Sequence, residues 1–140
     1  MLQKAMEIAK RALAGMTDQN GRPYIEHARR VMDRMDTEEE KTVAILHDVV
    51  EDTEMTLKDL MDEGFSRTVI DTLDQLTKRK DMTYDEYIED ISCSPLASKV
   101  KLAELEDNMD VVRVNKMSFK TYSLGERKAR SVKALTRSGV

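Results

Sequence analysis

The chain has 140 residues, of which 40% are hydrophobic and 4% aromatic, and this length suits a single domain over residues 1–140. Its formal net charge of −4 excludes broad, non-specific binding to nucleic acid. The one cysteine, Cys93, excludes an intrachain disulfide and favours a cytoplasmic protein. No segment approaches the roughly 18 apolar residues of a membrane span, and we expect neither a span nor a signal peptide. Oligomeric state is left open.

Helical periodicity dominates the first third of the chain. Apolar residues recur at helical spacing over residues 2–13, and the segment 18–23 then has the composition of a turn. The proline that ends this turn can open a second helix, whose apolar residues extend over 25–35. Thr37 and Glu40 have the spacing of a capping box, which predicts the start of a third helix.

The third predicted helix contains the most hydrophobic segment of the chain, residues 43–50. It is apolar all round, which indicates burial on every side. Further helices are expected from Thr56 to Gly64, Ser66 to Leu76, Thr83 to Ile91, from Pro95 onward through Leu105, and over residues 123–136. No segment has strand periodicity. The prediction is therefore an all-α fold, an irregular bundle of about seven or eight helices.

Both histidines of the chain lie in segments predicted to be helical and partly buried. His27 has apolar neighbours, and His47 directly precedes Asp48 in the most hydrophobic helix. Burying an imidazole and a carboxylate costs free energy unless they are paired or bound to a cation. One interpretation is a hydrogen bond in the core without an ion, and the other is a metal site.

A further group of polar residues favours the metal site. Glu104, Asp107 and Asn108 occur together on the long helix expected after Pro95. Two imidazoles with two carboxylates suit a divalent ion such as Mn²⁺, Fe²⁺ or Zn²⁺. The sequence thus contains a possible ligand set on three separate helices.

A pair of adjacent carboxylates follows the His47–Asp48 dipeptide. Glu51 and Asp52 stand where the third helix is expected to end, and two neighbouring carboxylates repel each other. Beside a metal ion they suit the general acid and base that act on an attacking water. The alternative is an acidic loop exposed to solvent.

Three blocks of the sequence resemble the HD superfamily of metal-dependent phosphohydrolases. They are Gly21–His27 (GRPYIEH), Ala44–Thr53 (AILHDVVEDT) and Val100–Glu104 (VKLAE) with Asn108 and Met109. More narrowly, the blocks are similar to the hydrolase domain of RelA/SpoT-type alarmone enzymes and to their small stand-alone relatives. They span most of the chain and occur in the family's order.

The resemblance implies an enzyme that removes the 3′-diphosphate of guanosine tetra- or pentaphosphate by means of a metal-bound water, with Mn²⁺ as cofactor and a nucleotide as its small-molecule partner. It also implies a role for each residue of the site. The implied metal ligands are His27, His47, Asp48 and Glu104; the residues acting on the water are Glu51 and Asp52; those on the substrate side are Asn108, with Lys101 and Tyr24 bracing the site.

This sequence departs from the family's pattern at two places. Glu104 stands where the family has an aspartate as fourth ligand, so Asp107 is an alternative, although we favour Glu104. The family also has a basic residue in the loop before Gly21, against the guanine end, whereas residues 16–20 here contain neither Arg nor Lys. An arginine that stacks on a base has no substitute among them. The resemblance therefore leaves the nucleobase open.

Two other functions are compatible with the same residues. One is an HD-type phosphohydrolase that acts on a different nucleotide, and the other is a catalytically silent domain that binds a nucleotide or regulates a partner. Cations that could hold an anionic substrate are Lys78, Arg79, Lys80, Arg127 and Arg130. Each of these, taken singly, is also compatible with an ordinary solvent-exposed charge.

Overall fold

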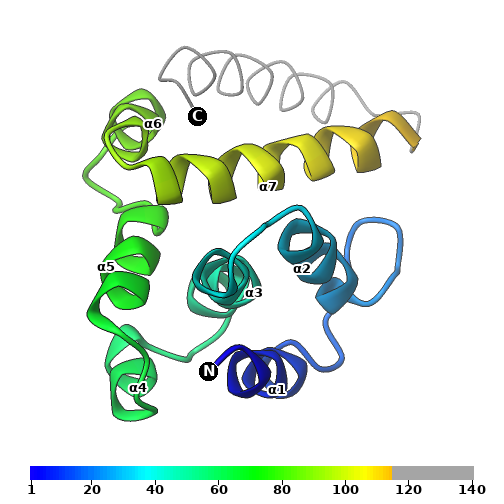
Figure 1. Ribbon diagram of the computed structural model, residues 1–140. Helices are drawn as coiled ribbons and strands as arrows, with labels where there is room; N and C mark the ends of the chain where they lie inside the picture. The colour runs from blue at the N-terminus through cyan, green and yellow to red at the C-terminus, as the bar shows by residue number, and fades with distance from the viewer. Residues whose placement is uncertain (115–140) are drawn as a thin grey trace. The chain divides into compact units, whose positions relative to one another are not determined.

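The computed structural model describes residues 1–114, which form helices joined by turns and loops (Figure 1). The helices are α1 (Leu2–Ala12), α2 (Tyr24–Asp33), α3 (Glu38–Asp52), α4 (Leu57–Asp62), α5 (Arg67–Leu76), α6 (Tyr84–Ser92) and α7 (Pro95–Val114). Within this part of the chain, the sole β-type pairing is an isolated bridge between Thr17 and Pro23. The predicted all-α class is confirmed. The helix expected over 123–136 lies outside the described residues.

Side-chain caps explain where several helices begin. Thr37 and Glu40 form the predicted capping box at the start of α3, and Thr56 and Thr83 open α4 and α6 in the same way. Ser66 caps α5 by accepting the N–H of Val69. The predicted starts of these four helices are therefore confirmed.

The ends of the first two helices differ slightly from the predicted limits. α1 stops at Ala12, one residue before the buried Leu13, and α2 stops at Asp33, so that the buried Met35 lies beyond it. Both side chains remain in the core although their backbone has left the helix. Burial there follows from packing rather than from helical periodicity alone.

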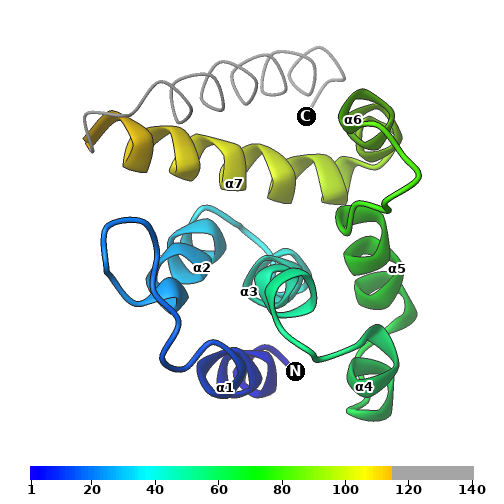
Figure 2. The ribbon, with the colours of Figure 1, turned by 180° about the vertical axis from the view of Figure 1, so that it is seen from behind.

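Contacts divide the chain into two compact units, Met1–Thr77 and Lys78–Val140. In the first unit, α3 lies in the middle and packs against α1, α2 and α5, as both views of the ribbon show (Figures 1 and 2). In the described part of the second unit, α6 packs against α7. The single domain predicted over residues 1–140 stays a prediction.

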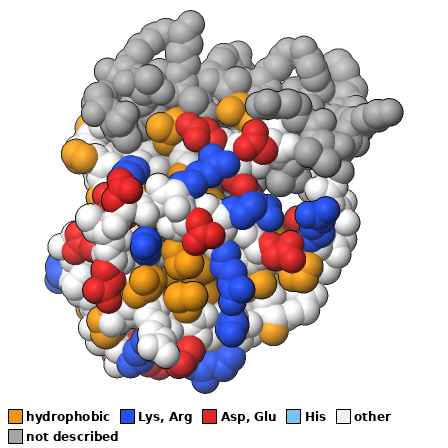
Figure 3. All heavy atoms as spheres, turned by 45° about the vertical axis from the view of Figure 1, so that its right-hand side comes forward, with side chains coloured by type: hydrophobic (Ala, Val, Ile, Leu, Met, Phe, Trp, Pro, Cys, Tyr) orange, Lys and Arg blue, Asp and Glu red, His pale blue; other side chains and the backbone are white. Residues whose placement is uncertain are grey.

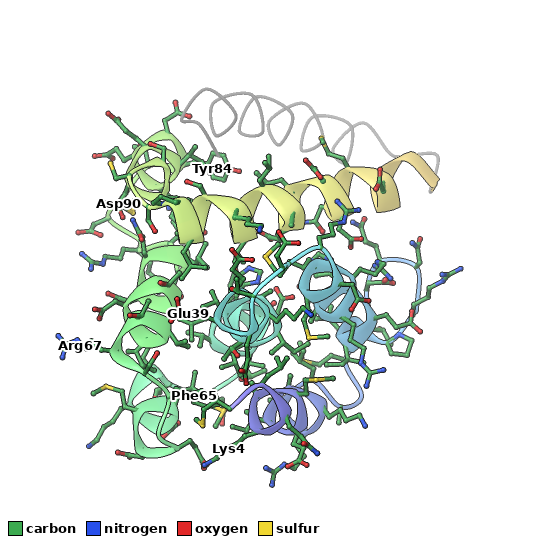
Figure 4. All side chains as sticks on the ribbon, viewed as in Figure 1. Lys4, Glu39, Phe65, Arg67, Tyr84 and Asp90 are labelled. Carbon is green, nitrogen blue, oxygen red and sulfur yellow. The ribbon has the colours of Figure 1, made fainter. Side chains whose placement is uncertain are left out.

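The central position of α3 explains its composition. Every residue from Thr42 to Val49 is buried, as its all-round apolar pattern predicts. At the opposite edge of the first unit, the Lys4 ammonium on α1 reaches α4, where it donates to the backbone carbonyl oxygen of Glu63 at 2.6 Å and lies 2.9 Å from its carboxylate (Figure 4). These polar contacts of Lys4 lie outside the core.

Among residues 1–114, no helix is long and apolar enough to span a membrane.

Candidate functional site

The candidate site is built around the buried C-terminal half of α3. His47 and Asp48 are each only 2% exposed, although both are polar. Their burial agrees with the apolar sequence of α3, because a helix that is apolar all round is enclosed by others, here α1, α2 and α5. An imidazole and a carboxylate in such a place require compensating partners.

α2 brings the second histidine to the same carboxylate. His27 is 6% exposed, and its Nε2 lies 3.7 Å from one oxygen of Asp48. The other oxygen of Asp48 lies 3.5 Å from Nδ1 of His47. The structure thus places both histidines of the chain next to one carboxylate, on two different helices of the first unit.

Glu51 lies on the solvent side of this group. Its Oε2 is 3.4 Å from Nε2 of His47, and its side chain is 44% exposed. One donor atom each from His47, Asp48 and Glu51 lie within 4.8 Å of one another. The site therefore extends from the core of the first unit to the surface at the end of α3.

The arrangement fits a divalent metal ion in its chemistry and in its spacing. Imidazole nitrogens and carboxylate oxygens are ligands of Mn²⁺, Fe²⁺ and Zn²⁺. The separations of 3.4–3.7 Å exceed ordinary hydrogen-bond lengths. Two ligand atoms that each lie about 2.0–2.2 Å from one ion are at most about 4.4 Å apart, and the His27–Asp48 and His47–Asp48 separations each satisfy that limit.

Asp52 ends α3, and the turn after it is well defined. The hydroxyl of Thr53 donates to the carbonyl of Val49 at 2.6 Å and accepts the N–H of Met55 at 3.2 Å. The last turn of α3 contains no basic residue, and Glu51 and Asp52 lie at the negative end of the helix dipole, which is an unfavourable place for two carboxylates. This unfavourable placement supports a chemical role for the acidic pair.

Tyr24, the first residue of α2, contacts both halves of the site. Its ring lies edge-on to that of His27, with 5.9 Å between centroids and 62° between planes. Its hydroxyl is hydrogen-bonded to the Asp52 carboxylate, and burial, followed by the charges of Asp48 and Asp52, raises its pKa far above the ordinary value. The phenol therefore stays protonated and acts as a hydrogen-bond donor.

The loop before Gly21 is ordered by hydrogen bonds from its backbone N–H groups, two of them to the side chain of Asp18. Asp18 Oδ1 accepts the N–H groups of Asn20 and Arg22 at 2.8 and 3.1 Å, and Gly21 takes a positive φ of 76°. The N–H of Tyr24 donates to the carbonyl of Met16 at 2.8 Å. The segment that lacks a basic residue is thus tied directly to the start of α2.

In the second unit, α7 carries a separate polar group with little solvent exposure. Lys101 and Glu104 are 6% and 8% exposed, and Lys101 Nζ lies 2.7 Å from Glu104 Oε2. Asn108 Nδ2 donates to Glu104 Oε1 at 3.4 Å. The three residues lie on one face of the helix because their spacing is three, four and seven. Asp107, the alternative ligand, is also buried, at 2% exposure.

Tyr87 belongs to the same group and was not predicted. It lies on α6, where the Lys101 ammonium is 5.2 Å from the centre of its ring, a cation–π contact. No motif marks this tyrosine in the sequence. Only the packing of α6 on α7 reveals it.

Replacing Lys101 with methionine is expected to lower the free energy of unfolding by about 3–5 kcal/mol, because the Glu104 carboxylate would stay buried without its ammonium partner. Urea denaturation measures the change. The exposed Lys80, replaced in the same way, should shift stability by less than about 0.5 kcal/mol. Equal effects of the two substitutions would contradict a stabilising ion pair on α7.

Of the five basic residues considered for substrate binding, the structure describes three. Lys78, Arg79 and Lys80 are exposed in the loop between α5 and α6, where Lys78 Nζ donates to the carbonyl of Arg79 at 3.1 Å. Arg127 and Arg130 lie outside the described residues. On the face drawn in Figure 3, basic and acidic side chains of the described residues are interspersed rather than gathered into a basic patch.

Comparison with known proteins identifies the fold. No family model and no curated protein matches the sequence. A solved structure of a metazoan ortholog of SpoT, which hydrolyses ppGpp and plays a role in starvation responses, matches with a TM-score of 0.80 and 23% identity, over 97% of this chain and 85% of that one. The resemblance predicted from the three sequence blocks is thereby confirmed at the level of the fold.

Proposed function

We propose that this chain is a metal-dependent phosphohydrolase whose substrate is guanosine 3′,5′-bis(diphosphate), from which it removes the 3′-diphosphate. The observation that carries the proposal is the convergence of His27 and His47 on the Asp48 carboxylate inside an apolar unit, at 3.7 and 3.5 Å. The fold shared with a SpoT ortholog that hydrolyses ppGpp supports the substrate.

His27, His47 and Asp48 would hold the divalent ion, which we propose to be Mn²⁺. When bound, such an ion lowers the pKa of a coordinated water and offsets negative charge on the phosphoryl group. Glu104 is proposed as the fourth ligand from the sequence resemblance alone. Asp107 is the alternative.

Glu51 and Asp52 are the residues proposed to act on the attacking water. Both are exposed at the end of α3, so substrate and water can reach them, while His47 and Asp48 are enclosed. Carboxylates near neutral pH are bases, so one of the pair can take a proton from the attacking water as its oxygen bonds to the phosphorus. That proton can then pass to the ribose 3′-oxygen as the bond between this oxygen and the phosphorus breaks, which releases the diphosphate. Asn108 is proposed to contact the substrate, and Lys101 to brace the site by holding Glu104.

A different nucleotide is the second candidate substrate, and the loop over residues 16–20 favours it. This loop contains no Arg or Lys, and its one charged side chain, Asp18, accepts backbone N–H groups at 2.8 and 3.1 Å. It therefore offers no guanidinium to stack on a guanine. A nucleotide recognised mainly through its phosphates would fit this loop equally well.

A substrate panel distinguishes the two candidates. With Mn²⁺, we expect stoichiometric pyrophosphate from guanosine 3′,5′-bis(diphosphate), and no turnover after removal of the metal by a chelator. Nucleoside monophosphates and phosphorylated dinucleotides are tested in the same panel as alternative substrates. Release of inorganic phosphate from one of them, without pyrophosphate from the guanosine compound, would replace the first candidate with the second.

The proposal also includes where the protein acts and which small molecule it binds. A cytoplasmic location and a nucleotide as the small-molecule partner were predicted from the sequence, and both agree with a phosphohydrolase of this kind.

A further inference from the structure

Tyr24 connects three segments of the first unit. Its backbone N–H donates to the carbonyl of Met16 in the preceding loop at 2.8 Å. Its ring lies against that of His27 on α2, with 5.9 Å between centroids. Its hydroxyl is hydrogen-bonded to Asp52, the last residue of α3. A single side chain thus links a proposed metal ligand to a proposed catalytic carboxylate.

The carboxylate of Asp52 lies where a link to another element favours a fixed direction. It is exposed and belongs to the last residue of its helix, where backbone hydrogen bonds open most readily. The negative end of the helix dipole and the neighbouring Glu51 both repel it. The Tyr24 hydroxyl, a hydrogen-bond donor on another element, opposes these forces.

We infer that Tyr24 is a positioning residue, whose hydroxyl holds the Asp52 carboxylate toward the site while its ring packs against His27. The inference deepens the proposed function and rests on it for the reaction concerned. Tyr24 itself needs no contact with the substrate. It acts through Asp52, and its benefit is the alignment of a proposed catalytic base.

The chemistry of the tyrosine suits this task. A phenol is un-ionised near neutral pH, so the Tyr24 hydroxyl can donate its proton in the hydrogen bond to Asp52. The half-buried ring has only two rotatable side-chain bonds, and its contact with His27 limits them further. A hydrogen bond from a neutral donor to a carboxylate is also stronger than one between two neutral groups.

A double-mutant cycle in the metal-free protein tests the link without any assay of activity. The variants are Tyr24→Phe, Asp52→Ala and their combination, each measured by urea denaturation. Removing Asp52 also relieves its repulsion from the helix end, but the cycle cancels that contribution. Tyr24→Phe is expected to lower the unfolding midpoint in the parent, and to have less than about half that effect when Asp52 is already alanine.

Kinetics with guanosine 3′,5′-bis(diphosphate) and Mn²⁺ test the consequence for the reaction. Tyr24→Phe keeps the ring and loses the hydroxyl, so we expect kcat to fall roughly 10- to 100-fold while KM changes less than about twofold. The matched control is Tyr84→Phe, which removes a hydroxyl of equal size from α6 in the other unit (Figure 4). That control is expected to leave both constants unchanged.

The two measurements separate failure of this inference from failure of the proposed function. If the parent hydrolyses the nucleotide and Tyr24→Phe retains its kcat, or if the shifts in the cycle are additive, the positioning role is overturned. If the parent has no activity on the nucleotide, the proposed function fails instead, and the cycle alone decides whether Tyr24 holds Asp52.

Discussion

Replacing His47 with alanine is expected to abolish metal binding and hydrolysis together. Its two ring nitrogens lie 3.5 and 3.4 Å from the carboxylates of Asp48 and Glu51, so its loss removes the imidazole at the centre of the group. Substitutions outside the ligand sphere already weaken metal binding 10- to 100-fold, and we expect more than about 100-fold here. Elemental analysis after incubation with Mn²⁺, followed by turnover on guanosine 3′,5′-bis(diphosphate), measures both losses.

Val43→Ala is the matched control for His47→Ala. Val43 lies one turn earlier on the same face of α3 and is fully buried, so its truncation destabilises the core by about 2 kcal/mol and leaves the donor groups intact. That variant should keep its metal and its activity. A parent protein that binds no stoichiometric transition metal when Mn²⁺ is supplied would overturn the metal site.

The combined substitution Glu51→Ala and Asp52→Ala is expected to lower kcat by about 10²- to 10⁴-fold, the usual contribution of general acid and base groups. Nucleotide binding should survive, because the pair is proposed to act on water and protons rather than to hold the substrate. Turnover and equilibrium binding of the same nucleotide are measured separately. Metal content is measured as well, since Glu51 lies 3.4 Å from His47.

Removal of two other exposed carboxylates provides the control for charge. Glu54 and Asp62 lie just beyond α3 and at the end of α4, and their replacement by alanine changes the net charge by the same amount. This control should retain full activity. If the parent and the Glu51/Asp52 variant both bind nucleotide and neither turns over any member of the panel, the chain is a silent binding domain.

Local sequence was sufficient to predict most of the helices. The capping box of Thr37 and Glu40 and the caps at Thr56, Ser66 and Thr83 depend on residues a few positions apart, and all four were found where expected. The prediction was less accurate at the ends of α1 and α2. There, Leu13 and Met35 are buried by other helices after their own helix has ended.

The residue types of the site were also visible in the sequence, but their partners were not. His47 and Asp48 are neighbours in the chain, and their burial follows from the apolar helix around them. Which oxygen of Asp48 faces His27, and which carboxylate Tyr24 holds, depends on how α2 packs on α3. The contact of Tyr87 with Lys101 likewise depends on α6 and α7.

The sequence by itself determined the all-helical class and the central burial of α3, and it supplied the side chains that we propose to bind a metal and act on water. These properties depend on periodicity, capping and residue chemistry, which act over one or two helical turns. Only the tertiary structure decided that two histidines from different helices face one carboxylate, and that a tyrosine holds the acidic end of α3. Such contacts join residues distant in the chain, and the packing of whole helix faces sets them.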